Sequence, residues 1–334
     1  MAKRAGFAKR DPMQFDQPFI KLPIRFDAET LEREVRALPE SAWVPHPSGY
    51  QGNEAVRLVT VGGQPRDDFE GPMRPTENLA RLPYIQQIMA RLGGVWSRSR
   101  LMGLAPGSEV PIHIDVHYHW RTHVRIHVPV ITNPKVLFTC GDETVHMAGG
   151  ECWLFDSFRW HRVENGWTER RVHLVLDTVM TDSLRALIDA ARRSDGGAEL
   201  EPPAAEPQAS RELKFEQFNV APVMSPWEIR CHLDFLFSQV VDHPDVPALR
   251  DLLERFVDSW AALWAQFGAS QQAVPAYRRL LAEYRTDIAR MAPDAVTLIN
   301  SVPLRNAIDS LILGPALSSA VVRADVAAAS RRFA

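Results

Sequence analysis

The chain has 334 residues, of which 46% are hydrophobic and 24% charged, a composition typical of a globular protein with one large or two ordinary domains. Its formal net charge of −3 gives no basic field for nucleic acid, and no segment approaches the roughly 20 apolar residues of a membrane span. The 3 scattered cysteines are too few for a disulfide framework or a thiolate zinc site. No apolar run of a signal peptide follows the charged start, so we expect a cytoplasmic protein that binds neither nucleic acid nor membranes.

The N-terminal part predicts an arm followed by a mixture of strands and helices. Residues 1–18 are expected to form a flexible arm. The stretch "FIKLPIRFDAETLEREVRAL" then predicts a strand and a helix, with Asp27 as the N-cap. "AVRLVTVGG" at 55–63 alternates like a strand that ends at its glycine pair, and "RLPYIQQIMARLGG" at 81–94 has helical spacing and a glycine stop.

Short strands and turns follow one another between residues 97 and 180. The turn sequences "APGS", "TNPK", "CGDE" and "AGGE" separate runs such as "VPIHIDVHY", "THVRIHVPVI" and "RRVHLVLDTV". This spacing predicts an all-β core, a double-stranded β-helix of the cupin-like jelly-roll type. With its flanking N-terminal helices, it should form a first domain over residues 19–185.

The remainder of the chain predicts a second domain of a different class. Residues 194–211 are rich in Pro, Ala and Glu without periodicity and are expected to be an exposed linker. Beyond it, "SPWEIRCHLDFLFSQVV", "VPALRDLLERFVDSWAALWAQF" and "VPAYRRLLAEYRTDIARM" each carry an amphipathic helical stripe. We therefore expect residues 212–334 to be mainly α-helical, with enough apolar surface to form a homodimer or a lid.

The stretch "EVPIHIDVHYHWRTHVRIHVPV", residues 109–130, collects an unusual number of the chain's 11 histidines. On a regular strand, residues two apart share a face, so that His113, Asp115, His117 and His119 would all project to one side. His113 and Asp115 have the H-x-D spacing with which two ligands on one strand can bind a single cation.

A third ligand must come from a strand that is later in the sequence but close in space. The best candidate is His161 in "FDSFRWHRVEN", at the start of the penultimate strand. Two imidazoles and one carboxylate leave three octahedral positions open and suit Fe(II). Zinc would usually take a fourth protein ligand or a single water.

The segment "RRVHLVLD", residues 170–177, offers a partner for an anion beside this metal. An arginine can hold the far carboxylate of a chelating 2-oxoacid with two parallel hydrogen bonds. Strand alternation places Arg171 on one face with His173 and Val175, and the neighbouring apolar residues on the other. Paired arginines are usually exposed charges, but this alternation argues that Arg170 or Arg171 points inward.

Taken together, "PIHID", "VRIHVPV", "GGECWLFDSFRWHRVEN" and "RRVHLVLD" resemble the aspartyl/asparaginyl β-hydroxylase family of Fe(II)/2-oxoglutarate-dependent oxygenases. The resemblance implies that His113 and His161 bind iron and that Arg171 binds the 2-oxoglutarate tail. Asp177 matches the aspartate that follows this arginine in the family. The best-known animal members bind iron with two histidines only, whereas this chain also offers Asp115. Bacterial members of the proline cis-4-hydroxylase-like branch look closer.

The resemblance covers about residues 20–180 and is strongest over 97–180. It further implies that Arg125 and His127 lie against the carboxylates of the cosubstrate. The implied activity is hydroxylation of an unactivated C–H bond, with Fe(II) as metal, 2-oxoglutarate as cosubstrate, O2 as oxidant, and succinate and CO2 as co-products. The expected substrate is a free amino acid such as proline, or an amino-acid residue in a peptide or natural product, ahead of a lipid acyl chain.

Other residues near the predicted site could support the ligands, contact the substrate or serve the structure. Asp156 and Ser157 precede His161 and could fix its ring. The substrate wall could include any of Tyr118, Trp120 and Arg121. His117, His119 and His123 could equally be half-exposed strand residues or contacts to the substrate. Structural roles are expected for Trp153, Phe155, His146, His173, His232 and His243.

Two other classes of protein fit parts of the sequence. The barrel could be a cupin-like protein that binds or senses a metal or small molecule without turnover, since fold alone does not fix function. The retained arginine after His161 argues against this, because a metal sensor needs no 2-oxoacid anchor. Alternatively, the helical domain could carry the function and the barrel could be an inactive scaffold.

Overall fold

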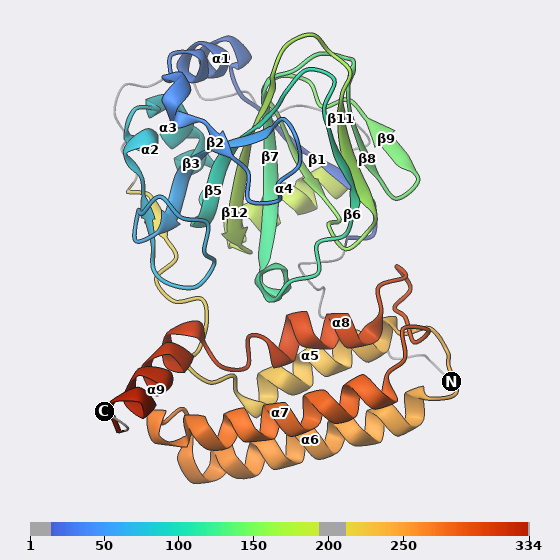
Figure 1. Ribbon diagram of the computed structural model, residues 1–334. Coiled ribbons are helices and arrows are strands. Elements are labelled where there is room, and N and C mark those ends of the chain that lie inside the picture. The colour runs from blue at the N-terminus through green and yellow to red at the C-terminus, as the bar shows by residue number, and fades with distance from the viewer. Residues whose placement is uncertain (1–14, 194–211, 333–334) are drawn as a thin grey trace. The chain divides into compact units, whose positions relative to one another are not determined.

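The computed structural model describes residues 15–193 and 212–332 (Figure 1). The chain divides into two compact units, one comprising residues up to Asp115 and His119–Gln217, the other Val116–Tyr118 and the residues from Phe218 onward. The predicted linker over 194–211, and the predicted arm up to residue 14, lie outside the described residues.

The first unit contains two β-sheets that face each other (Figure 1). The larger sheet has the order β1-β10-β7-β12-β5-β3-β2, with β4 paired to β3 and β13 paired to β5, and the smaller has the order β6-β11-β8-β9. The strands of the larger sheet are β1 (Phe19–Arg25), β2 (Val44–Pro45), β3 (Asn53–Val61), β4 (Met73–Pro75), β5 (Val95–Leu104), β7 (His123–Ile131), β10 (Glu151–Phe155), β12 (Arg171–Val179) and β13 (Lys214–Phe215). Those of the smaller sheet are β6 (Glu109–His113), β8 (Val136–Cys140), β9 (Glu143–Val145) and β11 (His161–Asn165). The pairing of β13 with β5 is parallel, and the other pairings described here are antiparallel.

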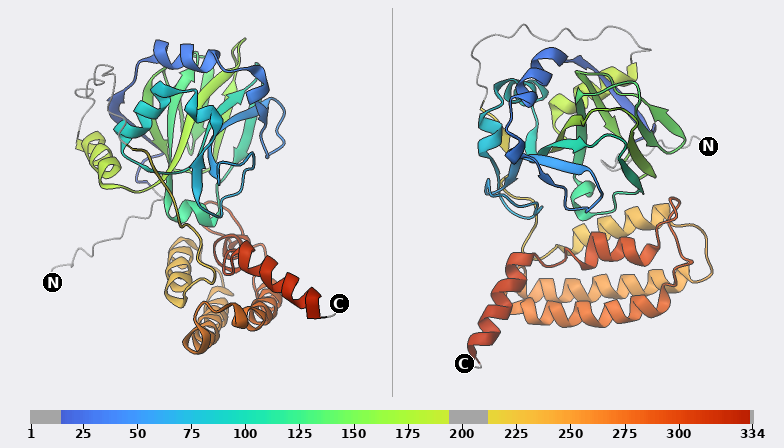
Figure 2. Two further views of the ribbon diagram at one scale, coloured as in Figure 1. Left: turned by 90° about the vertical axis from the view of Figure 1, so that its left-hand side faces the viewer. Right: turned by 45° about the horizontal axis from the view of Figure 1, so that its top comes forward.

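Four helices pack around the outside of the larger sheet (Figure 2). They are α1 (Ala28–Arg36), α2 (Glu77–Ala80), α3 (Pro83–Leu92) and α4 (Asp182–Arg193). As predicted, Asp27 caps α1, its side chain accepting hydrogen bonds from two backbone N–H groups of the first turn. Helix α3 ends at Gly93, whose φ of 67° is in the left-handed region that glycine adopts without strain.

Alternation along β7 and β12 separates an apolar face from a polar one. The outward face joins the helices in one buried core through Val124, Ile126, Val128, Val172, Leu174 and Leu176. The inward face carries Arg125, His127, Arg171, His173 and Asp177, all but Arg125 below 9% exposed. The larger sheet thus turns its charged face toward the smaller sheet, and residues of both sheets form a second apolar core. That core consists of Phe19, Leu104, Phe138, Cys140, Met147, Phe155 and Val163.

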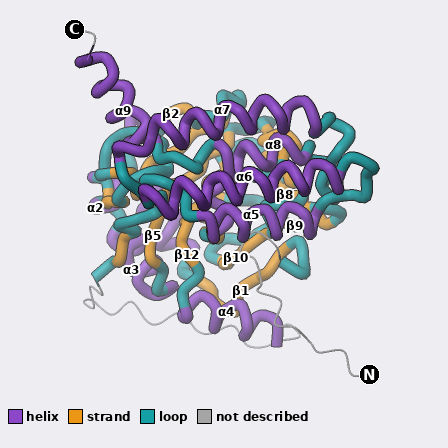
Figure 3. Tube along the Cα trace, turned by 90° about the horizontal axis from the view of Figure 1, so that it is seen from below, coloured by secondary structure: helices purple, strands orange, loops and turns teal. Residues whose placement is uncertain are grey.

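The second unit is helical, with α5 (Pro226–Gln239), α6 (Val246–Phe267), α7 (Val274–Met291), α8 (Leu304–Ile308) and α9 (Ser319–Arg332). Helices α5, α6, α7 and α8 run side by side in Figure 3. Buried rings of Phe256, Trp260 and Tyr277 form the centre of this unit, and the Trp260 indole N–H donates to the Met224 carbonyl at 2.8 Å.

The predicted fold class is confirmed. The core is a two-sheet antiparallel jelly roll with N-terminal helices, and the C-terminal part is mainly helical. Helices α6 and α7 have the same bounds as the two longest predicted amphipathic stretches. No helix among the described residues is long and apolar enough to cross a membrane.

Candidate metal centre

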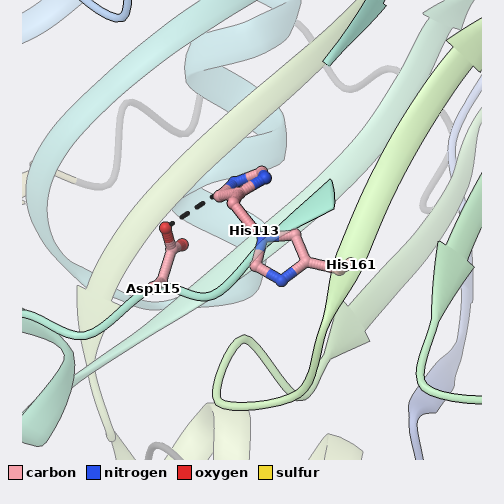
Figure 4. Close-up of side chains that lie close together, drawn as sticks. All are labelled: His113, Asp115 and His161. Atoms are coloured by element: carbon pink, nitrogen blue, oxygen red, sulfur yellow. Dashed lines mark ion pairs between the residues drawn. The ribbon is translucent and has the colours of Figure 1, made fainter. Parts of the chain in front are cut away.

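His113, Asp115 and His161 converge on one point at the rim of the smaller sheet (Figure 4). One potential ligand atom from each lies within 4.8 Å of the others. The antiparallel register pairs His161 on β11 directly with His113 at the end of β6, which brings the two ring centroids to 4.1 Å. His113 Nε2 lies 3.9 Å from Asp115 Oδ1. Among the described residues, this is the one group of three or more His, Cys, Asp or Glu side chains so arranged.

Backbone carbonyls fix the orientation of both imidazoles. His113 Nδ1 lies 2.8 Å from the Pro111 carbonyl, and His161 Nδ1 lies 2.9 Å from the Arg159 carbonyl. A carbonyl can only accept, so each ring carries its proton on Nδ1 and leaves the Nε2 lone pair free for a cation. Burial lowers the pKa of His161 to about 4, which keeps this ring neutral near pH 7.

The expectation that four residues from His113 to His119 share one strand face is wrong. Strand β6 ends at His113, and Asp115 lies in the irregular segment after it, held by a hydrogen bond from its N–H to the Ser157 carbonyl. His117 is exposed, and His119 lies in a short 3-10 turn, Tyr118–Arg121. Asp115 therefore reaches the two imidazoles because a turn, rather than strand alternation, places it there.

Arg171 is the inward-pointing member of the arginine pair. It is 4% exposed, and its Nε and Nη2 form no hydrogen bond with any described residue. Burial without a counter-charge lowers its pKa to about 9. Arg170, by contrast, pairs with Glu40 at the surface. A buried guanidinium with open donors is suited to an anionic ligand, because an unpaired buried charge is otherwise costly.

Arg125 is engaged by two carboxylates of the protein. Its Nε and Nη2 donate to Asp177 at 2.9 and 3.2 Å, and its Nη1 lies 3.6 Å from Asp115 Oδ2. Asp177 thus holds the guanidinium that faces the potential metal ligand. His127 lies between Phe155 and His173, with ring centroids at 5.3 and 5.8 Å. Burial and the nearby Arg171 keep the pKa of His127 well below its usual range.

Asp156 acts on His161 through the backbone. Its carboxylate accepts from the Phe158 N–H at 3.1 Å and from Arg159 Nε at 3.0 Å. These bonds hold the turn that presents the Arg159 carbonyl to the imidazole. The side chain of Asp156 therefore shapes the turn, and the ring itself is bonded by a main-chain oxygen, as the sequence alone does not predict.

Two groups of buried polar residues on the inner face were missed by the sequence prediction. Arg98 and Arg100 on β5 are 7% and 3% exposed. Glu216, which follows β13, is also buried, and its Oε1 lies 2.7 Å from His123 Nε2. The alternation "RSR" within a strand could have indicated the arginines, but nothing local to Glu216 indicates its distant partner.

The fold and this centre define a jelly-roll protein that can hold one cation on two imidazoles and a carboxylate, with a buried guanidinium on the inward face of the opposite sheet. Residues 27–181 match the family model of aspartyl/asparaginyl beta-hydroxylases. The resemblance identified from the sequence is thus confirmed for this segment, which is similar to the hydroxylase family over 27–181.

Solved structures that are similar to part of this chain include several oxygenases. A 2OG-Fe(II) oxygenase-family oxidoreductase from Burkholderia pseudomallei is 15% identical, with a TM-score of 0.37 over 48% of this chain and 85% of that chain. A prolyl-4-hydroxylase from Pseudomonas putida is 12% identical, with a TM-score of 0.34 over 50% of this chain and 95% of that chain. A prolyl hydroxylase from Trichoplax adhaerens, solved with a hypoxia-inducible-factor peptide, is 13% identical, with a TM-score of 0.34 over 51% and 87%. The sequence matches none of the curated proteins.

Proposed function

We propose that the protein is an Fe(II)- and 2-oxoglutarate-dependent dioxygenase that hydroxylates an unactivated C–H bond of an amino acid, free or within a peptide or natural product. The observation that carries this proposal is the coexistence of the His113–Asp115–His161 cluster at the rim of the smaller sheet with the unpaired buried guanidinium of Arg171 on the inward face of the larger sheet. A protein that only stores a cation has no need of the second feature.

His113, Asp115 and His161 are the proposed iron ligands. Both imidazoles turn Nδ1 toward a backbone carbonyl and leave Nε2 free, and Asp115 Oδ2 forms no hydrogen bond with any described residue, so the donor set fits a divalent cation. Arg125, fixed by Asp177, would orient the Asp115 carboxylate. When bound, iron and 2-oxoglutarate supply the activation of O2 that the side chains of this chain cannot provide.

Arg171 is the proposed anchor for the distal carboxylate of 2-oxoglutarate. Its open donors and its dry surroundings favour a charge-assisted bidentate hydrogen bond. His127, wedged between Phe155 and His173, would line the same cosubstrate pocket. The apolar rings of Phe138 and Phe155 around His161 would keep water from the reacting centre.

The remaining parts of the proposal concern assembly and location. We infer a homodimer through the second unit, supported by the exposed Trp227, Val241 and Ile299, which are 72%, 48% and 66% exposed. Sedimentation velocity across a hundredfold concentration range tests it, and a monomer throughout would contradict it. A cytoplasmic location fits the three cysteines, of which none is bridged among the described residues.

Succinate release tests the activity. Iron-loaded protein is mixed with 2-oxoglutarate in air, with each of the free amino acids or a panel of short peptides, and succinate and product masses are measured. We expect slow succinate formation alone, a faster rate with the correct substrate, and a product heavier by one oxygen atom. Binding of iron and 2-oxoglutarate without any succinate would instead identify a non-catalytic binding or sensing protein.

A further inference from the structure

Glu216 is a buried acidic residue that lies outside the segment matched by the family model, residues 27–181. It follows strand β13 directly and is 4% exposed. Its backbone N–H donates to the Trp96 carbonyl at 2.9 Å, and its carbonyl accepts from the Met73 N–H at 2.7 Å. These bonds fix its main chain on the larger sheet, and its carboxylate begins a series of buried side chains that leads to Asp115.

His123 is the first side chain in this series and is held at both ring nitrogens. Its Nε2 lies 2.7 Å from Glu216 Oε1, and its Nδ1 lies 2.9 Å from the His119 carbonyl. The imidazoles of His123 and His119 also stack, with centroids 3.8 Å apart and an interplanar angle of 12°. Because His119 belongs to the short 3-10 turn before β7, Glu216 fixes the position of this turn through His123.

The turn contacts the guanidinium of Arg125 and the carboxylate that holds it. Trp120, which is 4% exposed, lies against the guanidinium face, with the central carbon 4.2 Å from the ring centroid. His119 Nε2 lies 3.7 Å from Asp177 Oδ2, and Asp177 accepts from Arg125 Nε and Nη2 at 2.9 and 3.2 Å. The ring and the carboxylate together fix Arg125 where its Nη1 is 3.6 Å from Asp115 Oδ2.

We propose that Glu216 is a positioning residue of the candidate metal centre, because it fixes the turn that holds Arg125 against the Asp115 carboxylate. Asp115 follows the end of β6, so the orientation of its carboxylate depends on neighbouring side chains rather than on strand pairing. Glu216 acts through these side chains and touches neither metal nor substrate. The inference rests on the proposed function, since it assigns a role in the same centre.

Binding of Co(II) to the metal-free, full-length protein tests this role without turnover. The visible absorption of bound Co(II) reports its ligand geometry and gives its dissociation constant. We expect Glu216→Ala to raise this constant about 10-fold, because His123 and the turn lose their fixed position. Glu216→Gln keeps an acceptor oxygen and should stay within about threefold of wild type. Wild-type affinity and an unchanged spectrum in Glu216→Ala would overturn the proposal.

Glu151→Ala separates a positioning role from a general loss of stability. Glu151 is another buried carboxylate of the first unit, 8% exposed, and accepts from Lys21, the Trp153 indole and the Ala148 N–H. Its loss should destabilise the unit at least as much as the loss of Glu216, which chemical denaturation measures, while Co(II) affinity stays at the wild-type value. Equal weakening of Co(II) binding in both variants would contradict a positioning role.

A double-mutant cycle tests the route through the turn. Trp120→Leu removes the aromatic face from Arg125. Because Glu216 acts through the same turn, adding Glu216→Ala to Trp120→Leu should weaken Co(II) binding much less than Glu216→Ala does alone. Full additivity of the two changes would refute the proposal. Should Glu216→Ala fail to fold, Glu216→Asp takes its place with the same expectation, since its carboxylate is one methylene too short to reach His123.

The same measurements distinguish failure of this inference from failure of the proposed function. Wild-type protein that binds no Co(II) would refute the metal centre and both proposals with it. Co(II) binding without succinate from the iron-loaded protein would refute the oxygenase, and the affinities of the variants would still decide the role of Glu216. Succinate formation by wild type with unchanged Co(II) affinity in Glu216→Ala would refute the positioning role and leave the oxygenase intact.

Discussion

At the scale of single residues, the candidate metal centre depends on two imidazoles whose tautomers are set by carbonyls two residues earlier in the chain. Pro111 and Arg159 provide these carbonyls for His113 and His161. Because the free Nε2 atoms are preset, little reorganisation is needed when a cation binds. Asp115 completes the set from a turn, so its position depends on the hydrogen bond to Ser157 more than on strand pairing.

Replacing either imidazole should abolish iron binding. His113→Ala and His161→Ala each remove one of three ligands, and we expect iron affinity and 2-oxoglutarate turnover to fall by more than about 100-fold, beyond the effect of losing a group behind a ligand. Iron is measured after gel filtration, and turnover as succinate. His243→Ala, at a half-buried position in the second unit, is the matched control. Full activity in His161→Ala would refute the assignment of this ligand.

Replacing the buried arginine should affect the cosubstrate and leave the metal in place. Arg171→Gln exchanges a charge-assisted bidentate bond for a neutral one, so the concentration of 2-oxoglutarate needed for half-maximal rate should rise about 10- to 100-fold. Arg170→Gln, which alters the contacts of Arg170 with Glu40, Glu54 and Trp43, should leave it unchanged. An equal effect of both variants would show that the anchor lies elsewhere.

At the scale of elements, the first unit is completed by a strand that follows the predicted linker in the sequence. Strand β13 pairs with the start of β5, and the carbonyl of Glu216 accepts from the Met73 N–H at 2.7 Å. The Glu216 side chain bonds His123, whose ring stacks on His119 at a centroid distance of 3.8 Å. The folded boundary of the first unit is therefore Gln217, and a truncation before residue 214 would remove part of its sheet.

Loss of the Glu216 carboxylate should destabilise the first unit. Glu216→Ala leaves the buried Nε2 of His123 without its acceptor, which typically costs about 1–3 kcal/mol. Glu216→Gln keeps an acceptor oxygen and should cost less. Chemical denaturation measures both, with the exposed Glu212→Ala as control. Equal stability of Glu216→Ala and wild type would mean that the hydrogen bond contributes nothing.

Much of this architecture could be predicted because it follows from periodicity. The 3.6-residue spacing of apolar residues predicted helices α6 and α7. Strand alternation predicted that Arg171 points inward, away from the face that carries Val172 and Leu174. Asp115 was assigned to the correct cluster for the wrong reason, since it lies beyond the end of β6. A two-residue strand such as β13 has no period to detect, and its partner on β5 is more than a hundred residues away in sequence.

At the scale of the whole molecule, buried neutral histidines should make the protein sensitive to acid. Burial lowers the pKa of His46 and of His119 to about 3, below the ordinary value of about 6.5. A lowered pKa in the folded state stabilises the fold fully above pH 6.5, and this stabilisation is lost as the pH falls toward 3. The free energy of unfolding should therefore decrease below pH 6.5 by roughly 1.4 kcal/mol per pH unit for each ring.

Denaturation of the metal-free protein between pH 7.5 and 4.5 tests this dependence. His46→Gln retains an acceptor for Arg100 but cannot be protonated, so its stability should decline less steeply with acid than that of wild type. A stability that is constant or rises as the pH falls would contradict neutral burial of these rings.

The central claim is that one cation site and one buried guanidinium form a joint site for iron and 2-oxoglutarate. The most direct measurement is an anaerobic titration of iron-loaded protein with 2-oxoglutarate, followed by visible absorption. We predict a weak charge-transfer band that saturates at one equivalent in wild type, needs far more 2-oxoglutarate in Arg171→Gln, and is absent in His161→Ala. No band in iron-loaded wild type, or an identical titration in all three proteins, would contradict the account.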